Sequence, residues 1–285
     1  MFMNEQLKKL IKLINDADAI VIGAGAGLST AAGFEYGGNT FLKHFKYMND
    51  EYGYTDMYSA GFHQFQSSEE KWGYWSKFIW LNRYQGVKKL YKDLFELIKN
   101  KNYFVITTNV DHQFQLAGFD KKRLFYMQGD YGLFQCSKPC HNLTYDNKKK
   151  IMRMVREQKD GLIPSSLIPK CPICGKEMTT NLRCDDTFVE DNGWKEASNR
   201  YLCFLKENYG KKVLYLELGV GFNTPVIIKY PFWKMAFQNE NAHYVCINKG
   251  QIYIPNEIKN RSLGFNVDIS NIINELLEDK NGKNN

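Results

Sequence analysis

Short apolar runs alternate with amphipathic stretches along most of this chain. The apolar runs are four to six residues long and lie at residues 19–22, 103–107, 124–127, 213–218 and 243–248. Runs of this kind are typical of strands that are buried on both faces of a parallel sheet. Helical spacing of apolar residues marks the stretches at 5–15 and 87–100, and we also predict helices at 201–208 and 269–277. The alternation predicts an α/β fold in which helices flank a parallel sheet.

Two regions interrupt this alternation. Residues 34–80 are dense in tyrosine and phenylalanine, which is unlike a disordered linker. We predict that they form short helices and loops packed on the main body. From Phe134 onward the chain carries two pairs of cysteines separated by a lysine-rich stretch, which we interpret as a loop. We find no internal repeat.

The first apolar run leads into a glycine-rich stretch, Gly23-Ala24-Gly25-Ala26-Gly27-Leu28-Ser29. Glycines after a buried strand let the backbone approach a pyrophosphate, and the amides that begin the next helix face the anion. We predict that residues 29–32 form the first turn of that helix. The spacing differs from G-x-G-x-x-G, because the third glycine comes one position early. A plain tight turn would also suit these residues, so the glycines alone identify no ligand.

The composition is that of a soluble globular protein. With 285 residues, 44% of them hydrophobic and 24% charged, the chain can form one large domain and a smaller one. The net charge of +7 comes from lysines spread along the chain, apart from residues 148–150 and the basic residues after them. This distribution favours an anionic nucleotide or an acidic partner over nucleic acid. We find no signal peptide or membrane span and expect a cytoplasmic protein with no membrane partner.

Four of the seven cysteines form two close pairs. Cys136 and Cys140 make one pair, and Cys171 and Cys174 make the other. Four thiolates on two short loops suit tetrahedral zinc, and a metal with four protein ligands is expected to be structural. His141 is a substitute ligand if a cysteine is misplaced, and the alternative to a metal site is four unpaired buried thiols. The remaining cysteines are expected to be core thiols: Cys184, Cys203 and Cys246.

The motifs, taken together, resemble the sirtuin family and follow its order. The stretch at 23–29 resembles the G-A-G-x-S loop, and Thr107-Thr108-Asn109-Val110-Asp111 resembles T-Q-N-I-D. The four cysteines follow, and then come Leu182-Arg183-Cys184-Asp185 for L-R-P-D, Gly219-Val220-Gly221 for G-T-S, and Ile247-Asn248 for I-N. The resemblance covers nearly the whole chain. It implies a Rossmann-like NAD domain at 1–130 and 200–285, with a helical insertion at about 37–83 and a small zinc domain at 131–199.

The resemblance also implies roles for individual residues. Asn109 would bind the nicotinamide ribose or order a water, Asp111 would hold the carboxamide, and Asn248 would contact the adenosine ribose. Asn109 and Asp111 could instead simply cap their loop. The NAD-binding set that the resemblance implies is Gly23, Ala24, Gly25, Gly27, Ser29, Phe34, Tyr36, Thr108, Asn109, Asp111, Gln128, Gly219, Val220, Gly221 and Asn248.

One position departs from the deacylating sirtuins. They carry a histidine as general base after the strand that matches 124–127, where this chain has Gln128. A glutamine amide cannot take up a proton near neutral pH, and the loss of a general base lowers a rate by about 10²–10⁴. Cleavage of the glycosidic bond of NAD needs only an oriented NAD and a nucleophile. Gln128 resembles the class M sirtuins, whose likeness implies a protein ADP-ribosyltransferase. The active-site residues implied are Asn109, Asp111, Gln128 and Arg183.

The leading hypothesis is therefore NAD-dependent transfer of ADP-ribose to a protein side chain, with release of nicotinamide. By resemblance, the acceptor is a lipoyl-carrier protein related to the glycine cleavage H protein. Arg183 would stabilise the pyrophosphate or orient the acceptor, or else form a surface salt bridge.

Two alternatives remain open. His112 could be the base of an atypical lysine deacylase, although it could equally be a structural histidine. The loop at 33–38 lacks the arginine of the family's loop over nicotinamide, which would suit a non-catalytic NAD or ADP-ribose-binding protein. Phe34 or Tyr36 would shield the nicotinamide in its place, or be ordinary core.

Overall fold

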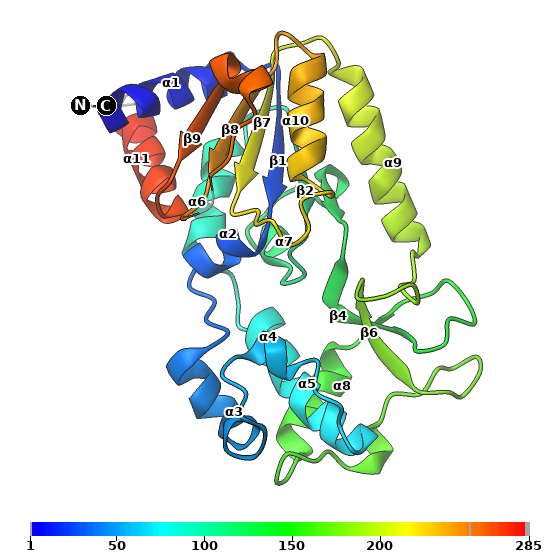
Figure 1. Cartoon of the computed structure of the whole chain (residues 1–285). Helices are drawn as coiled ribbons and strands as arrows, with labels where there is room; N and C mark the ends of the chain where they lie inside the picture. Colours follow the sequence, from blue (N-terminus) through cyan, green and yellow to red (C-terminus); the bar gives the residue numbers. More distant parts are fainter. Residues whose placement is uncertain (1, 251, 283–285) are drawn as a thin grey trace. The chain divides into compact units, whose positions relative to one another are not determined.

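The computed structural model describes residues 2–250 and 252–282 (Figure 1). The described residues form two compact units. We call the first the sheet unit; it comprises the described residues of 1–33, 87–128 and 193–285. The second, which we call the small unit, comprises residues 34–86 and 129–192, so the aromatic-rich region and the cysteine pairs lie in one unit.

A six-stranded sheet of parallel strands forms the centre of the sheet unit. The strands are β1 (Ala19–Ala24), β2 (Tyr103–Thr107), β3 (Leu124–Tyr126), β7 (Val213–Leu218), β8 (His243–Ile247) and β9 (Ser262–Phe265). Their order across the sheet is β3-β2-β1-β7-β8-β9, which is the doubly wound order of dinucleotide-binding folds. The α/β, Rossmann-like fold class is therefore confirmed.

Helices cover both faces of this sheet (Figure 1). One face packs against α1 (Phe2–Asp16), α6 (Lys89–Ile98) and α11 (Ile269–Gly282), and the other against α9 (Asn192–Glu207) and α10 (Lys229–Gln238). Successive residues of β1 alternate between the two cores, so that Ile20 joins one and Val21 the other. Burial on both faces explains why the strands have no polar alternation.

The helix after β1 begins earlier than the sequence predicted. Helix α2 spans Ala26–Ala31, so residues 29–32 lie at its end, and the prediction of a first turn there is wrong. Gly25 is the N-cap, in an extended conformation, and the amide of Gly27 donates to the carbonyl of Gly219 at 2.9 Å. The helix therefore starts within the glycine stretch.

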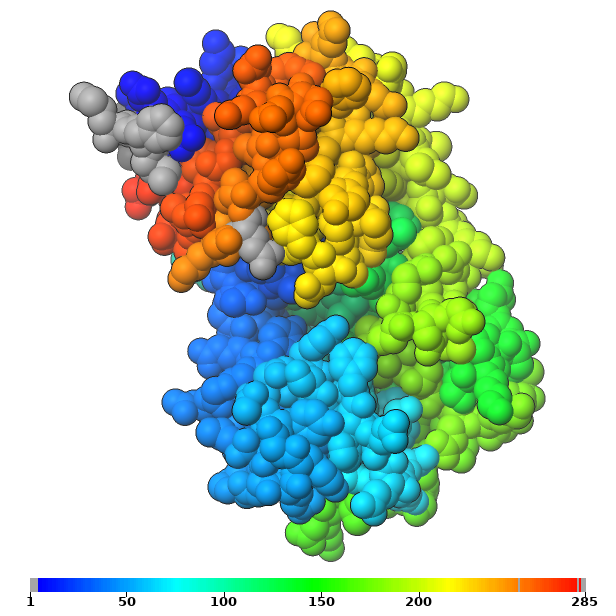
Figure 2. All heavy atoms as spheres, in the orientation of Figure 1, coloured from blue at the N-terminus to red at the C-terminus, as the bar shows by residue number. Residues whose placement is uncertain are grey.

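The small unit combines a helical layer with a short antiparallel sheet. Its helices are α3 (Gly38–Tyr52), α4 (Met57–Ala60), α5 (Ser68–Arg83) and α8 (Lys148–Glu157), and its strands are β4 (Gly129–Cys136), β5 (Tyr145–Asp146) and β6 (Met178–Leu182), paired in the order β5-β4-β6. Figure 2 shows the blue-to-cyan atoms of the segment 34–86 lying together as one continuous surface. An apolar cluster that includes Trp72, Phe78 and Phe134 joins the helices to this sheet.

Three short elements complete the sheet unit and one completes the small unit. Helix α7 (Gln113–Leu116) follows β2, η1 (Lys121–Arg123) precedes β3, and η3 (Asn256–Arg261) precedes β9. In the small unit, η2 (Ser165–Leu167) follows α8.

The lysine-rich stretch is a helix, so its interpretation as a loop is wrong. It forms α8, in which Ile151 and Met154 are fully buried against the apolar cluster of the small unit. The three lysines and two arginines among its ten residues hid this short apolar stripe. The prediction of core thiols is wrong for Cys184 and Cys203, which are exposed, and it is confirmed for Cys246, which is buried.

Candidate active site and metal centre

Two glycine loops meet at the carboxyl edge of the parallel sheet. The strand order reverses between β1 and β7, and ligands of doubly wound sheets bind at that switch point. A Cβ on Gly25 would lie 2.7 Å from the carbonyl oxygen of Gly219, and one on Gly27 would lie 2.7 Å from the Cα of Gly219. Gly219 itself has φ +64°, in the left-handed region. Only glycines allow this backbone-on-backbone contact.

Gly23 and Asn248 fix the surroundings of these loops. A Cβ on Gly23 would lie 2.4 Å from Ile228 and 2.6 Å from Phe232, so this glycine allows α10 to pack closely on β1. The amide of Asn248, directly after β8, donates to the carbonyl of Val220 at 3.4 Å. The residues predicted from the second glycine motif and from I-N therefore lie together.

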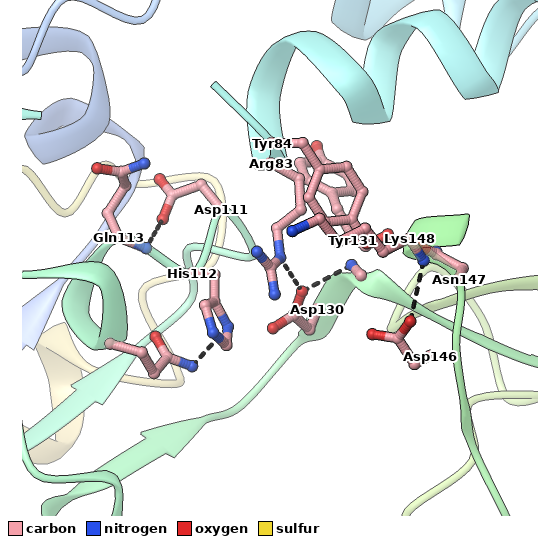
Figure 3. A network of polar contacts seen from close by, with 12 residues as sticks. Arg83, Tyr84, Asp111, His112, Gln113, Asp130, Tyr131, Asp146, Asn147 and Lys148 are labelled. Carbon is pink, nitrogen blue, oxygen red and sulfur yellow. Dashed lines mark hydrogen bonds and ion pairs between the residues drawn. The ribbon is translucent and has the colours of Figure 1, made fainter. Parts of the chain in front are cut away.

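A chain of buried hydroxyl groups ends at the carboxylate of Asp111. Ser29 Oγ donates to Asp111 Oδ2 at 2.6 Å, and it lies 3.0 Å from the hydroxyl of Tyr91. Asp111 Oδ1 accepts from the backbone amide of Gln113 at 3.0 Å (Figure 3). All three side chains in the chain of contacts are at most 2% exposed. Asp111 is thus held in one orientation by both of its oxygens.

Asn109 is attached to the same network. Its Nδ2 donates to the carbonyl of Gly25 at 2.9 Å and to the hydroxyl of Tyr91 at 3.3 Å, while its backbone amide donates to Thr107 Oγ1 at 3.0 Å. Its Oδ1 has no hydrogen-bond partner among the described residues, and it is not sealed from solvent. Thr108 is held nearby by a bond from its amide to the carbonyl of Ala24. The side chain of Asn109 therefore presents its amide oxygen as the group available to a ligand.

Tyr91 is the residue of this network that the sequence did not single out. It lies on α6, where its position on the apolar face predicted only a core residue. Its hydroxyl contacts Ser29, Asp111 and Asn109, at 3.0, 3.5 and 3.3 Å. The sequence could have pointed to Tyr91 because it is a tyrosine on a buried helix face, and a buried tyrosine hydroxyl usually has a polar partner.

Other predicted active-site residues are divided between the two units. Gln128 is half-buried just after β3 in the sheet unit, and its side chain forms no hydrogen bond with a described residue. Phe34, Tyr36 and Arg183 belong to the small unit. There Arg183 pairs with Glu190 at 2.6 Å and lies 4.3 Å from the ring centroid of Phe188. Arg183 therefore has the salt bridge that the sequence left as one of its alternatives.

His112 has an unusual backbone conformation. Its φ of 66° lies in the left-handed region, which a residue with a side chain adopts only when its surroundings impose it. Figure 3 shows His112 beside Asp111; its Nδ1 lies 2.7 Å from the amide nitrogen of Gln115, and its ring is stacked with that of Tyr126 at a centroid distance of 6.3 Å. The side chains of His112 and Gln115 therefore hold each other in place.

A charged turn follows Gln128 in the small unit. Gly129 has φ +93°, and a Cβ there would lie 2.0 Å from the carbonyl oxygen of Asn181. Asp130 Oδ1 accepts from the amide of Gly132 at 2.6 Å and from the guanidinium of Arg83 at 2.7 Å (Figure 3). The contact with Asn181 therefore leaves no room for a side chain at position 129.

The four predicted cysteines form one cluster in the small unit. Their sulfur atoms all lie within 4.8 Å of one another. Cys136 and Cys174 are 3.6 Å apart, and Cys140 and Cys171 are 3.8 Å apart. A tetrahedral site with Zn–S bonds of about 2.3 Å requires sulfurs about 3.8 Å apart. The cluster thus fits zinc and supplies all four ligands.

The pKa values of the clustered thiols also indicate that a cation is needed to stabilise their thiolate forms. The backbone amides of Cys174 and Ile173 lower the pKa of Cys171 to about 6. Desolvation and the neighbouring thiols raise the pKa of Cys140 to about 12. Four adjacent thiolates can therefore form together only when a metal ion neutralises them.

His141 lies beside the metal cluster and is not needed as a ligand. Its Nδ1 accepts from the amide of Leu143 at 3.1 Å, which leaves the proton on Nε2, 3.3 Å from the sulfur of Cys171. The loop at Cys171 is closed by the amide of Gly175, which donates to the Cys171 carbonyl at 2.9 Å with Gly175 at φ +71°. His141 is therefore an outer hydrogen-bond donor to a ligand.

Comparisons with known proteins place the chain among relatives of one kind. No family model matches the sequence. A protein ADP-ribosyltransferase of Staphylococcus aureus is 42% identical over 282 residues, which cover 97% of this chain and 90% of that protein. A probable bifunctional ADP-ribose hydrolase/ADP-ribosyltransferase of Fusarium oxysporum is 29% identical, and the match covers 93% of this chain and 46% of that longer protein.

Solved structures share the fold. The crystal structure of a Sir2 homologue in complex with NAD superposes with a TM-score of 0.62 at 16% identity, over 97% of this chain and 94% of that one. A structure on sirtuin substrate affinity superposes with a TM-score of 0.61 at 18% identity, over 95% and 98% of the two chains. At these identities the likeness is one of fold. No helix in the described part of the chain is long and apolar enough to span a membrane.

Proposed function

We propose a reaction for this chain on the premise that it belongs to the protein ADP-ribosyltransferases, built on the sirtuin fold. NAD is the donor, and the acceptor is a nucleophilic side chain of another protein. The bond between the ribose C1′ and the nicotinamide nitrogen breaks, and its electrons leave with nicotinamide. The acceptor atom bonds to C1′ and releases its proton to solvent.

The network at Asn109 is the observation that carries this proposal. The glycine loops at Gly25 and Gly219 accommodate the pyrophosphate, and Asn248 contacts the adenosine ribose. The free Oδ1 of Asn109 faces the nicotinamide ribose, where it orients the sugar for bond cleavage. Asp111, fixed by Ser29 and the amide of Gln113, binds the carboxamide of nicotinamide. This set orients NAD without supplying a base.

Gln128 supports transfer rather than deacylation. A primary amide can hydrogen-bond to a ribose hydroxyl but cannot remove its proton. His112 is the alternative base, and its Nδ1 is already in hydrogen-bond contact with Gln115, 2.7 Å away. Arg183, which pairs with Glu190 in the small unit, orients the acceptor in this proposal.

The acceptor we propose is a lipoylated carrier protein related to the glycine cleavage H protein, and the site of action is the cytoplasm. A reducing compartment suits the four zinc-binding thiolates. The zinc, held by all four cysteines, has no open coordination position and is structural.

Replacement of Asn109 by alanine tests the reaction. NAD labelled on its adenylate is incubated with the protein and the lipoylated carrier, and an acetylated-lysine peptide is run in parallel. We expect label on the carrier and no loss of acetyl from the peptide. In the Asn109→Ala variant, nicotinamide release should fall roughly 100-fold, because a positioned polar group is lost. Asn102→Ala, at the opposite edge of β2, is the matched control and should be unchanged.

Other outcomes of these experiments would support one of the two alternative functions, a deacylase or a non-catalytic NAD-binding protein. Deacetylation that is lost in a His112→Ala variant, with no label on protein, would establish the deacylase. Binding of NAD without any release of nicotinamide would establish a non-catalytic sensor. A Gln128→Ala variant that transfers ADP-ribose at the unchanged rate would remove Gln128 from the active site.

Tyr91 has a positioning role in this proposal. A Tyr91→Phe variant keeps the ring and its packing but removes the hydroxyl that contacts Ser29, Asp111 and Asn109. We expect about a fivefold rise in the KM for NAD or fall in kcat, since the loss of one buried hydrogen bond amounts to about 1 kcal/mol. The control is Tyr201→Phe, a buried tyrosine of the same unit with no such partners. Equal kinetic constants in Tyr91→Phe and the unchanged protein would exclude the role.

A further inference from the structure

Helix α8 of the small unit carries a positive charge that the proposed reaction does not use. Its ten residues, Lys148–Glu157, hold five cations and a single carboxylate. That carboxylate, Glu157, lies 3.1 Å from Arg153 and 2.9 Å from Arg156. None of the three lysines at 148–150 forms an ion pair with a described residue. The lysine end of α8 is therefore a positively charged surface.

The position of these lysines is unfavourable for the helix itself. They occupy the first turn, which contains no acidic residue, and the carboxylate of Asp146 just before the helix accepts from the amide of Lys148 at 3.1 Å (Figure 3). The amino end of a helix is the positive end of its dipole, where acidic residues stabilise and basic residues destabilise. Burial and the charge of Arg153 also lower the pKa of Lys150. Helix stability thus does not account for the three lysines.

The helix is nevertheless fixed in place. Asn147, fully buried before its first turn, accepts from the hydroxyl of Tyr84 at 2.7 Å and donates to the carbonyl of Tyr131 at 2.8 Å. Ile151 and Met154 are fully buried in the apolar cluster with residues of α5 and β4. The outward side chains are thus presented on a rigid element, as a recognition surface requires.

We propose that the exposed face of α8, formed by Lys148, Lys149, Met152 and Arg153, docks an acidic surface of the protein that receives ADP-ribose. This rests on the proposed function, which requires a protein acceptor. Met152 is 46% exposed among these cations, and methionine and arginine are both enriched at protein interfaces. The helix has no aromatic residue on which a nucleic-acid base could stack. Its chemistry therefore favours a protein over a nucleic acid.

Reversal of two charges tests the surface without endangering the fold. In a Lys148→Glu/Lys149→Glu variant, both changes fall on exposed positions, and the new carboxylates complement the helix dipole. We expect unchanged or higher thermal stability, together with a roughly tenfold weaker affinity for a lipoylated carrier protein of negative net charge. Affinity is measured by fluorescence anisotropy of labelled carrier at several salt concentrations. Lys8→Glu/Lys9→Glu, on the exposed face of α1 in the sheet unit, is the matched control and should not change it.

Each outcome decides between the surface and the reaction. Binding of the carrier that is weakened by the α8 variant and by salt, but without transfer of label, would support the surface and overturn the proposed function. Transfer and binding that are equal in both variants and the unchanged protein would overturn the surface alone. The docking surface would also be overturned if the carrier did not bind the unchanged chain. It would likewise be overturned if a short RNA or DNA duplex bound through α8 and the carrier did not displace that duplex.

Discussion

Removal of zinc should unfold the cysteine-bearing part of the small unit while the sheet unit stays folded. Two of the ligands, Cys136 and Cys171, are also buried members of the apolar cluster that joins the helices to the short sheet. Binding of structural zinc contributes about 10–16 kcal/mol to the folding of small modules. The apolar cluster stabilises the small unit independently of zinc. We therefore expect the loss of zinc to lower the free energy of unfolding of this unit by only part of that amount. A Cys171→Ser variant should therefore bind no zinc and show an early thermal transition.

The measurement is zinc content per chain together with thermal unfolding. Cys203→Ser is the matched control, since Cys203 is exposed on α9 and far from the cluster in sequence. It should keep one zinc ion per chain and the unchanged transition. A chelator should reproduce the effect of Cys171→Ser on the unchanged protein. A metal-free protein with the same transitions as the zinc-bound one would show that the cysteines have no structural role.

The strands and the metal ligands were predictable because their signals are local. A strand buried on both faces needs a short apolar run, and β2 and β7 have the bounds that the sequence predicted. The cysteine pairs were predictable because two ligands on one short loop must be close in sequence. The fold then brings the loop with Cys136 and Cys140 next to the loop with Cys171 and Cys174.

The features that the sequence did not predict depend on contacts between distant segments. Tyr91 became part of the site through side chains 62 and 20 positions away, at Ser29 and Asp111. The helix at α8 depends on Ile151 and Met154 finding an apolar cluster built elsewhere in the chain. No pattern within the lysine-rich stretch could show that this cluster exists.

A buried ion pair beside the second glycine loop is also visible only in three dimensions. Lys229 of α10 and Glu217 of β7 form an ion pair in which neither side chain is exposed to solvent. The other oxygen of Glu217 accepts from the hydroxyl of Tyr244 at 2.8 Å. Burial and the charge of Glu217 raise the pKa of Cys246 to about 12, so this thiol stays protonated and lies 3.3 Å from the carboxylate. Glu217 is thus fully paired, two residues before Gly219.

Removal of Lys229 alone should be strongly destabilising. A Lys229→Met variant leaves the carboxylate of Glu217 buried without its cation, which lowers the free energy of unfolding by about 3–5 kcal/mol. Glu217→Gln/Lys229→Met replaces the pair with a neutral amide that still accepts from Tyr244, and should recover most of this loss. Lys89→Met is the control, because its pair with Asp93 has a lysine that is 79% exposed and contributes under about 1 kcal/mol.

Urea unfolding and the KM for NAD together decide what the pair does. If it only stabilises the core, the double variant should regain both stability and the unchanged KM. If the cation also holds the loop after β7, the KM should stay raised when stability is restored, since Lys229 lies 4.9 Å from the ring centroid of Phe222, next to Gly221. A Lys229→Met variant as stable as Lys89→Met would contradict the pairing itself, because an uncompensated charge cannot remain in this core without loss of stability.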